Sequence, residues 1–253
     1  MALTVAVIGA LEKEMRRIYD ALEDKRIAQE AGLTVASGRL GDLDVVATVA
    51  GMGTVNAAAA TQHLISAHGA GTVIFSGIAG GLNPKLHIGD VVIGERLRYL
   101  DTDTALVAES APGLEEFASD AGLVALAEHA LAARGYAEIA EPAAEEADAA
   151  PAPGDGERLC FLRGTIATGD RFVSGSELKA AVVAATQADC VEMEGAAIAH
   201  VAAKNGARCL ILRAISDNCD ESYDALSSRE FDLDEYARSA SELVLAIVRN
   251  LSA

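Results

Sequence analysis

Apolar runs and amphipathic segments alternate along this chain of 253 residues. Residues 3–8 form a short apolar run that predicts a buried strand, and Leu11, Met15 and Ile18 then recur at helical spacing. Gly41 and Asp42 separate two strand-like segments and predict a hairpin turn. The same criteria predict strands at 33–40, 43–50, 72–76, 91–95, 159–168, 190–192 and 209–215, and helices at 54–68, 120–134, 177–185, 195–205 and 233–251.

This order of elements predicts the fold class. Strands that alternate with helices, several of them uniformly apolar, are typical of an α/β protein. We therefore expect a three-layer α/β/α sandwich whose central sheet is mixed, mainly parallel, and covered on both faces. Nothing resembling a linker divides the chain, so we expect one domain over 1–253. Residues 140–157 are rich in Pro, Ala, Gly, Asp and Glu without a core-facing period, which predicts a mobile surface loop.

Polar or glycine-rich groups follow four of the predicted strands, where ligands bind in open α/β sheets. They are Glu12 with Glu14, the glycine-rich segment 77–81, residues 192–194, and Ser216 with Asp217. Acidic residues at helix starts also oppose the helix dipole, and this structural role is sufficient for Glu12. Glu194 and Asp217 follow apolar strands, where water is partly excluded. A carboxyl group there tends to retain its proton, as a general acid requires.

Charge and composition exclude several classes of function. The formal net charge of −18 makes a nucleic-acid binder or an anionic-lipid binder a poor interpretation. The N-terminal apolar run lacks a basic region and is too short for a signal peptide, and no stretch reaches membrane-spanning length. We therefore expect a soluble, cytoplasmic protein without nucleic-acid or membrane partners.

Neither a metal nor a cofactor is predicted. The four cysteines and five histidines lack the spacing of zinc, redox or helical metal sites. The segment 51–56 begins like a dinucleotide fingerprint, but Asn56 occupies the third glycine position. Gly77, Gly80 and Gly81 more simply allow the backbone to approach a small ligand closely.

Six sequence blocks together resemble one enzyme family, the 5′-methylthioadenosine/S-adenosylhomocysteine nucleosidases. They occur in the family's order and span nearly the whole chain: 8–15 (IGALEKEM), 77–82 (GIAGGL), 88–92 (IGDVV), 169–176 (GDRFVSGS), 191–194 (VEME) and 213–217 (RAISD). The wider superfamily, which includes the purine nucleoside phosphorylases, shares some of these blocks. The resemblance implies a nucleoside phosphorylase-like fold, an adenine nucleoside as substrate, and a homodimer.

The resemblance also implies roles for individual residues. Asp217 matches the general acid that protonates the imidazole-ring nitrogen of adenine, with Ser216 as its hydrogen-bond partner. Glu14 matches the residue that positions and deprotonates the attacking water. Glu194 matches the group that grips the ribose hydroxyls, with Met193 packed against the sugar. Further substrate-binding positions implied by the match are Leu11, Met52, Ile78, Phe172, Val173, Glu192 and Arg213.

The chemistry of the reaction explains why these residue types belong together. Cleaving a purine glycosidic bond builds positive charge on the ribose and negative charge on the departing base. A protonated carboxyl group serves the base, and ionised carboxylates serve the sugar and the water.

A phosphorylase would instead bind a phosphate dianion, usually with arginines. Phe75 and Ser76 occupy the position of one such arginine, and Glu12 and Glu14 would repel phosphate. The sequence therefore favours a hydrolase.

Departures from the family pattern lie at the mouth and 5′ end of the expected pocket. Ile78 replaces a serine found in many relatives, residues 105–112 contain no aromatic side chain, and Tyr223 is only a candidate for the aromatic lid over the purine. Alternatives therefore stay open: an aminodeoxyfutalosine-type nucleosidase, a purine nucleoside phosphorylase, and a non-catalytic nucleoside-binding protein.

Overall fold

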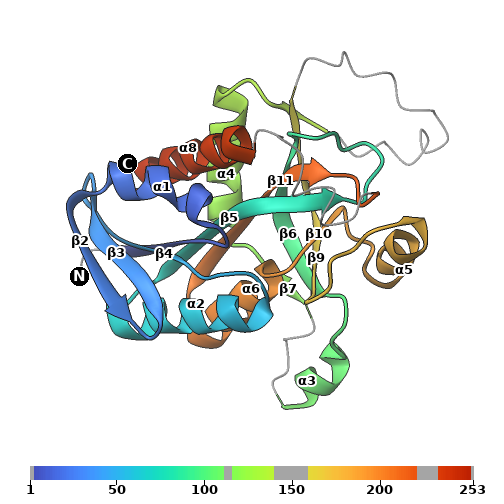
Figure 1. Ribbon diagram of the computed structural model, residues 1–253, viewed down its shortest axis with the longest axis horizontal. Coiled ribbons are helices and arrows are strands. Elements are labelled where there is room, and N and C mark those ends of the chain that lie inside the picture. The colour runs from blue at the N-terminus through green and yellow to red at the C-terminus, as the bar shows by residue number, and fades with distance from the viewer. Residues whose placement is uncertain (1–2, 111–115, 140–158, 221–232, 252–253) are drawn as a thin grey trace.

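The first half of the chain builds one side of a large sheet. The computed structural model describes residues 3–110, 116–139, 159–220 and 233–251 (Figure 1). Its first elements are β1 (Thr4–Gly9), α1 (Glu12–Ala21), β2 (Glu23–Glu30), β3 (Leu33–Leu40), β4 (Leu43–Val49), α2 (Thr54–His68) and β5 (Thr72–Gly81). The strands β3 and β4 pair antiparallel around Gly41, whose φ of 63° suits a tight turn, so the predicted hairpin is confirmed.

The second half supplies the remaining strands and five of the described helices. They are β6 (Val91–Tyr99), α3 (Thr104–Ser110), β7 (Phe117–Ala118), α4 (Ala121–Ala133), β8 (Ala137–Glu138), β9 (Cys160–Thr168), α5 (Ser176–Thr186), β10 (Cys190–Glu192), α6 (Gly195–Asn205), β11 (Arg208–Asp217) and α8 (Leu233–Leu251). Each predicted strand and helix is present, and the helix predicted at 54–68 has the expected bounds. The segment 140–157 lies outside the described residues.

All described strands belong to one eleven-stranded sheet with the principal order β10-β9-β6-β11-β5-β1-β4-β3-β2. Parallel and antiparallel pairings both occur, which confirms the predicted mixed sheet. In addition, β10 pairs antiparallel with β5, with Cys190 opposite Gly81. This pairing closes β5, β11, β6, β9 and β10 into a ring, a feature that the sequence analysis does not predict.

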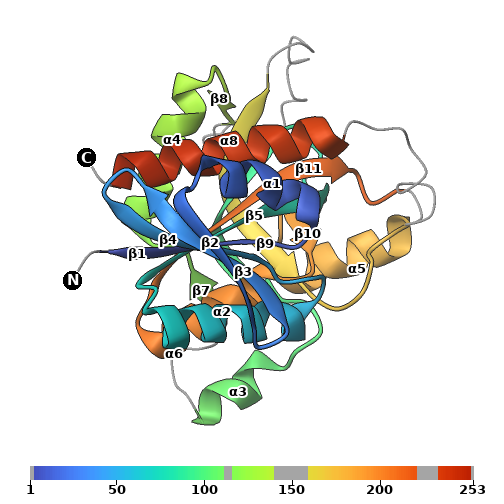
Figure 2. The same ribbon diagram turned by 60° about the vertical axis from the view of Figure 1, so that its left-hand side comes forward.

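Helices cover both faces of the sheet, as predicted for three layers. One face packs against α2 and α6 through buried residues such as Ala57, Leu64 and Ile198. The opposite face packs against α1, α4 and α8 through residues such as Met15, Leu131 and Ile247. Figures 1 and 2 show these two helical layers on opposite sides of the strands. Since the central strands are covered on both faces, their apolar runs are nearly continuous.

None of the described helices has the length and apolar character needed to cross a membrane.

The strand predicted at 72–76 is longer in the structure, because residues 77–81 continue β5 and pair with β11 and β10. The glycine-rich segment is therefore part of the sheet. Its location brings the backbone of β5 to the carboxyl ends of β1 and β11.

Candidate active site

A cavity of about 380 Å³ opens where β1, β5, β10 and β11 end. Every residue predicted for the site lines it: Leu11, Glu14, Met52, Ile78, Phe172, Val173, Glu192, Met193, Glu194, Arg213, Ser216 and Asp217. The cavity also contacts Gly80, one of the glycines expected to approach a ligand, and Ala10, Lys13, Ala79, Arg171, Val191 and Cys219, for which no role was predicted. Each of these is a chain neighbour of a predicted residue or lies one residue beyond it. The predicted groups therefore converge, although their separation along the chain exceeds 200 residues.

Glu14 lies in the first turn of α1 and turns back toward the end of β1. Its Oε2 accepts hydrogen bonds of 2.8 Å from the backbone N–H groups of Ala10 and Leu11. These donors would otherwise lack partners at the start of the helix. Burial raises the pKa of Glu14 above its ordinary value, against the opposing effects of these N–H groups and of Arg213. A carboxyl group with a raised pKa is a better match for a general base near neutral pH.

Glu194 and Arg213 form a buried ion pair on the floor of the cavity. Arg213 Nη2 donates to Glu194 Oε2 at 3.3 Å, and the guanidinium lies 4.1 Å above the ring of Phe75. Glu194 Oε1 accepts a 2.8 Å hydrogen bond from Gly53 N, which precedes α2. Burial raises the pKa of Glu194 to about 7, with a smaller contribution from the nearby Glu192 and in opposition to Arg213. This carboxyl group therefore changes its charge around neutral pH. The shift agrees with the retained proton expected after an apolar strand, and it differs from the fully ionised form implied for a sugar ligand.

The carboxylate of Glu192 is hydrogen-bonded to other groups of the protein. It accepts hydrogen bonds from the hydroxyl of Thr168, from the backbone N–H groups of Glu194 and Gly195, and from Arg213. These contacts hold the first turn of α6 and orient Arg213. Although Glu192 borders the cavity, its oxygens have little remaining capacity for a substrate. Its contacts fit a positioning residue better than the predicted substrate contact.

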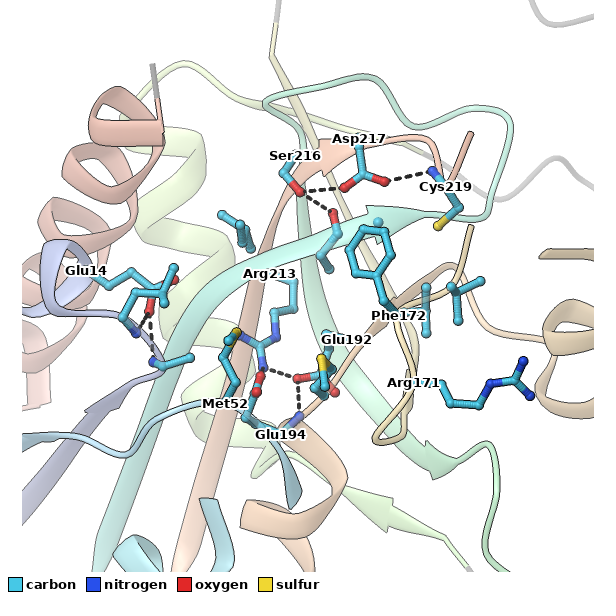
Figure 3. A pocket seen from close by; sticks show the side chains of 18 of the residues that line it. Glu14, Met52, Arg171, Phe172, Glu192, Glu194, Arg213, Ser216, Asp217 and Cys219 are labelled. Atoms are coloured by element: carbon cyan, nitrogen blue, oxygen red, sulfur yellow. Dashed lines mark hydrogen bonds and ion pairs between the residues drawn. The ribbon is translucent and has the colours of Figure 1, made fainter. Parts of the chain in front are cut away.

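Asp217 ends β11 at the other side of the cavity. Its Oδ1 accepts a 2.8 Å hydrogen bond from Cys219 N. The Ser216 hydroxyl lies 2.8 Å from Asp217 Oδ2 and 3.2 Å from the carbonyl oxygen of Ala79. Because a hydroxyl group has one proton, donation to Ala79 leaves Asp217 Oδ2 able to carry a proton of its own. Figure 3 shows Ser216 and Asp217 well separated from Glu14, with Arg213 and Glu194 below them in this view.

Two glycines of β5 make room for these side chains. A Cβ atom on Gly77 would stand 2.3 Å from Arg213 Nη1 and 3.1 Å from Glu14 Oε1. A Cβ atom on Gly80 would stand 2.4 Å from Cys219 Sγ and 3.1 Å from Asp217 Oδ1. The strand therefore passes Arg213 and Glu14 closely at Gly77, and Cys219 and Asp217 closely at Gly80. Burial raises the pKa of the Cys219 thiol to about 12, so this neighbour of Asp217 is uncharged.

Apolar side chains form the rest of the wall. Phe172 is directed toward the space between Asp217 and Arg213, and Met52 lies beside Glu194 (Figure 3). Both are partly exposed at the rim, at 38% and 50%. Val173 is buried, while Ile78 and Met193 are half-buried. A flat apolar ring bound here would be stacked and shielded from water, with polar groups at its edges.

The positively charged side chains that line the cavity are poorly placed to bind an anion. The Arg213 guanidinium is 1% exposed and paired with two glutamates. Arg171 borders the cavity, but its guanidinium points away from the other labelled side chains (Figure 3). Lys13 is half-buried beside Glu14. The described lining thus presents four carboxyl groups and no pair of arginines arranged to hold a dianion.

Comparisons with known proteins relate the sequence and the fold of this chain to one superfamily. Residues 4–249 match the family model of the Phosphorylase superfamily. A 5′-methylthioadenosine/S-adenosylhomocysteine nucleosidase of Treponema pallidum (strain Nichols) is 36% identical, over 99% of this chain and 94% of the relative. The same-named enzyme of Neisseria meningitidis, solved in complex with methylthio-immucillin-A, is 32% identical with a TM-score of 0.80, over 98% of this chain and 99% of that one. The native futalosine hydrolase of Helicobacter pylori strain 26695 is 26% identical with a TM-score of 0.81, over 99% of both chains.

Proposed function

The chain belongs to the Phosphorylase superfamily, and on that premise we propose that it is a nucleosidase acting as one domain. It hydrolyses the N-glycosidic bond of 5′-methylthioadenosine and S-adenosylhomocysteine and releases adenine and the 5′-thio-substituted ribose. The observation that carries the proposal is the division of one cavity between Asp217 at one end and Glu14 with Glu194 at the other. The relatives named as nucleosidases support the same activity.

Asp217 is the general acid in this proposal. Adenine stacks on Phe172 beside Val173, with its five-membered ring facing Asp217. As the glycosidic bond lengthens, Asp217 transfers its proton to the ring nitrogen that gains electron density. Ser216 and the N–H of Cys219 hold the carboxyl group in place during the transfer.

Glu194 and Glu14 serve the sugar and the water. Glu194, with Arg213 behind it, accepts hydrogen bonds from the ribose hydroxyl groups, while Met193, Met52, Leu11 and Ile78 pack around the sugar and its 5′ group. Glu14 accepts a proton from water as the water oxygen bonds to the anomeric carbon. Both carboxylates also stabilise the positive charge that develops on the ribose. The proton balance closes, since one proton reaches adenine and one reaches Glu14.

Water is the nucleophile because the site offers phosphate no suitable partner. The Arg213 side chain is already paired with Glu192 and Glu194, and a dianion beside Glu14 would meet like charge. The reaction needs no cofactor or metal, since side-chain acids and bases suffice for proton transfer.

Two further parts of the proposal concern assembly and location. Exposed apolar side chains include Met52 just before α2, Val55 on α2 and Leu106 on α3, and we propose that a second copy of the chain covers them in a homodimer. The enzyme acts in the cytoplasm in methionine salvage, where a reducing environment keeps cysteines as thiols. Light scattering on the purified protein and cell fractionation test these statements.

Product analysis tests the reaction itself. The purified protein is incubated with 5′-methylthioadenosine, S-adenosylhomocysteine or aminodeoxyfutalosine, each with and without phosphate. Free adenine and an unphosphorylated thioribose at the same rate in both conditions support the proposal. A ribose 1-phosphate formed only with phosphate would identify a phosphorylase. Cleavage of aminodeoxyfutalosine alone would identify the other nucleosidase, and the absence of adenine from every substrate would identify a binding protein.

A further inference from the structure

Two histidines and a glutamate meet at the end of the sheet opposite the closed ring of strands. His63 and His68 belong to α2, and Glu30 is the last residue of β2. Glu30 Oε2 lies 3.0 Å from His63 Nε2 and 2.7 Å from His68 Nε2. All three side chains are 20–29% exposed, so they are accessible to small ions from solvent yet restrained by their neighbours.

We propose that Glu30, His63 and His68 form a binding site for a divalent transition metal ion, with Zn²⁺ as the favoured ligand. Imidazole nitrogen and carboxylate oxygen are donors that Zn²⁺ accepts readily. Each residue offers one donor atom, and the three atoms lie within 4.8 Å of one another. Among the described residues this is the one such group of histidine, cysteine, aspartate and glutamate side chains.

The geometry suits coordination. In a tetrahedral zinc site with bonds of about 2.0–2.1 Å, neighbouring donor atoms are separated by roughly 3.3 Å. The separations of Glu30 Oε2 from His63 Nε2 and His68 Nε2, 3.0 Å and 2.7 Å, need to expand by only a few tenths of an ångström. The two rings are T-shaped with centroids 5.7 Å apart, so they approach Glu30 from different directions rather than stacking. Three protein donors leave one position for water.

The backbone fixes the donors before any ion binds. Ala31 and Gly32 both have positive φ, 47° and 78°, and turn the chain tightly from β2 into β3. Glu30 is therefore held by a hairpin turn, while the two histidines are held by a helix of 15 residues. This cluster is not predictable from histidine spacing, because the histidines of helical metal sites usually stand four residues apart. These histidines are five apart, and the third donor comes from a different element.

The site is remote from the proposed chemistry. Helix α2 begins beside Gly53, whose N–H holds Glu194, and it ends at His68. A helix of this length spans about 22 Å. We therefore expect the ion to tie the β2–β3 hairpin to α2 without taking part in glycosidic cleavage.

Calorimetric titration of chelator-treated, tag-free protein with Zn²⁺ tests the proposal. We expect one equivalent per chain, with affinity lowered at least tenfold in each of Glu30→Gln, His63→Gln and His68→Gln. His129→Gln removes an exposed histidine from α4 and is the matched control, which should bind Zn²⁺ like the unmodified protein. Zn²⁺ should also raise the thermal midpoint of the unmodified protein and not that of the three variants.

Absence of binding, or equal binding by all variants, would overturn the proposal and leave the cluster as a hydrogen-bond network. A Co²⁺ absorption spectrum gives a second measurement that needs no variant. Bands of a nitrogen- and oxygen-ligated ion support the site, whereas a thiolate charge-transfer band would assign the metal to cysteine and overturn it. Adenine release measured alongside should be unchanged in all four variants, so failure of the metal site remains distinguishable from failure of the proposed nucleosidase activity.

Discussion

The proposed chemistry of this cavity depends on three carboxyl groups, whose surroundings differ. Asp217 is held by a hydroxyl group and one backbone N–H. Glu14 is held by two N–H groups at a helix start, and Glu194 by an arginine and another N–H. The carboxyl group thus serves as acid, base and sugar ligand in the proposed mechanism because each of the three has different neighbours.

Asp217→Asn removes the proposed acid while keeping the shape of the side chain. We expect turnover to fall by about 10²–10⁴-fold, the usual contribution of general acid catalysis. Nucleoside binding, measured by calorimetry, should change little. A variant that turns over at the original rate would remove Asp217 from the mechanism.

The pKa of Glu194, raised to about 7 by burial, predicts a pH-dependent affinity. The ribose hydroxyl groups donate to the ionised form, so binding weakens as pH falls and Glu194 gains a proton. Well below pH 7, the Kd of 5′-methylthioadenosine should rise about tenfold per pH unit. Measuring Kd on the Asp217→Asn protein avoids substrate turnover.

Glu194→Gln provides the matched control for this titration. Its affinity should be weaker at pH 8 and nearly independent of pH, because the amide does not titrate. If the unmodified side chain gave the same flat profile, Glu194 would not be the group that senses pH.

At the scale of elements, the strands and helices with a hydrophobic period were predictable and the others were not. Every position of β2 is exposed or half-buried, so its sequence carries no period, and it forms a strand because its backbone pairs with β3. The short β7 and β8 and the helix α3 likewise depend on their surroundings. The closure of β10 onto β5 depends on contacts between residues about 110 positions apart, which no local pattern contains.

The candidate site was more predictable than the fold around it, because its residues stand directly after apolar strands. Local sequence gives no sign that Glu192 is saturated by Thr168 and the start of α6. The apolar strand before Glu194 predicts the direction of its pKa shift, but not the value of about 7 that burial produces. Tyr223, the candidate lid, lies outside the described residues.

Strand β5 depends on Gly77 for a close approach between elements. In Gly77→Ala, the new methyl group would stand 2.3 Å from Arg213 Nη1, and Arg213 is fixed by Phe75 and two glutamates. We expect a loss of about 1–3 kcal/mol in the free energy of unfolding, measured in urea, together with a lower rate of adenine release.

Gly71→Ala is the control for this substitution. Gly71 directly precedes β5, and a Cβ atom there has no neighbour nearer than Leu3 Cδ1 at 4.0 Å. Its stability should stay within about 0.5 kcal/mol of the original protein. Equal losses in both variants would mean that the crowding at Gly77 is relieved by small movements.

The whole molecule carries 38 acidic and 20 basic side chains, which gives the formal net charge of −18. Some basic groups bridge helices, as where Glu242 of α8 pairs with Arg17 of α1 and with Arg134 at the end of α4. Such exposed pairs contribute little, whereas repulsion among the excess carboxylates acts over the entire surface.

Added salt should therefore stabilise the protein. Screening shortens the range of repulsion to about 8 Å at physiological ionic strength and to about 3 Å at 1 M. We expect the thermal midpoint to rise by about 2–4 °C, corresponding to about 1 kcal/mol for a chain of this size. Scanning calorimetry over a series of NaCl concentrations provides the measurement. A falling midpoint would mean that bridging ion pairs outweigh the general repulsion.

The exposed strand β2 has a consequence for self-association. It lies at the end of the sheet, and an open edge can recruit a strand from another molecule and seed aggregates. The segment Glu23, Asp24, Lys25 and Arg26 places four charges on that edge, and its pairing with β3 is irregular where Asp24 adopts a φ of 51°. Such a kinked, charged border is a poor template for intermolecular β-pairing. The sheet can thus end at a solvent-exposed strand without making the protein aggregate at high concentration.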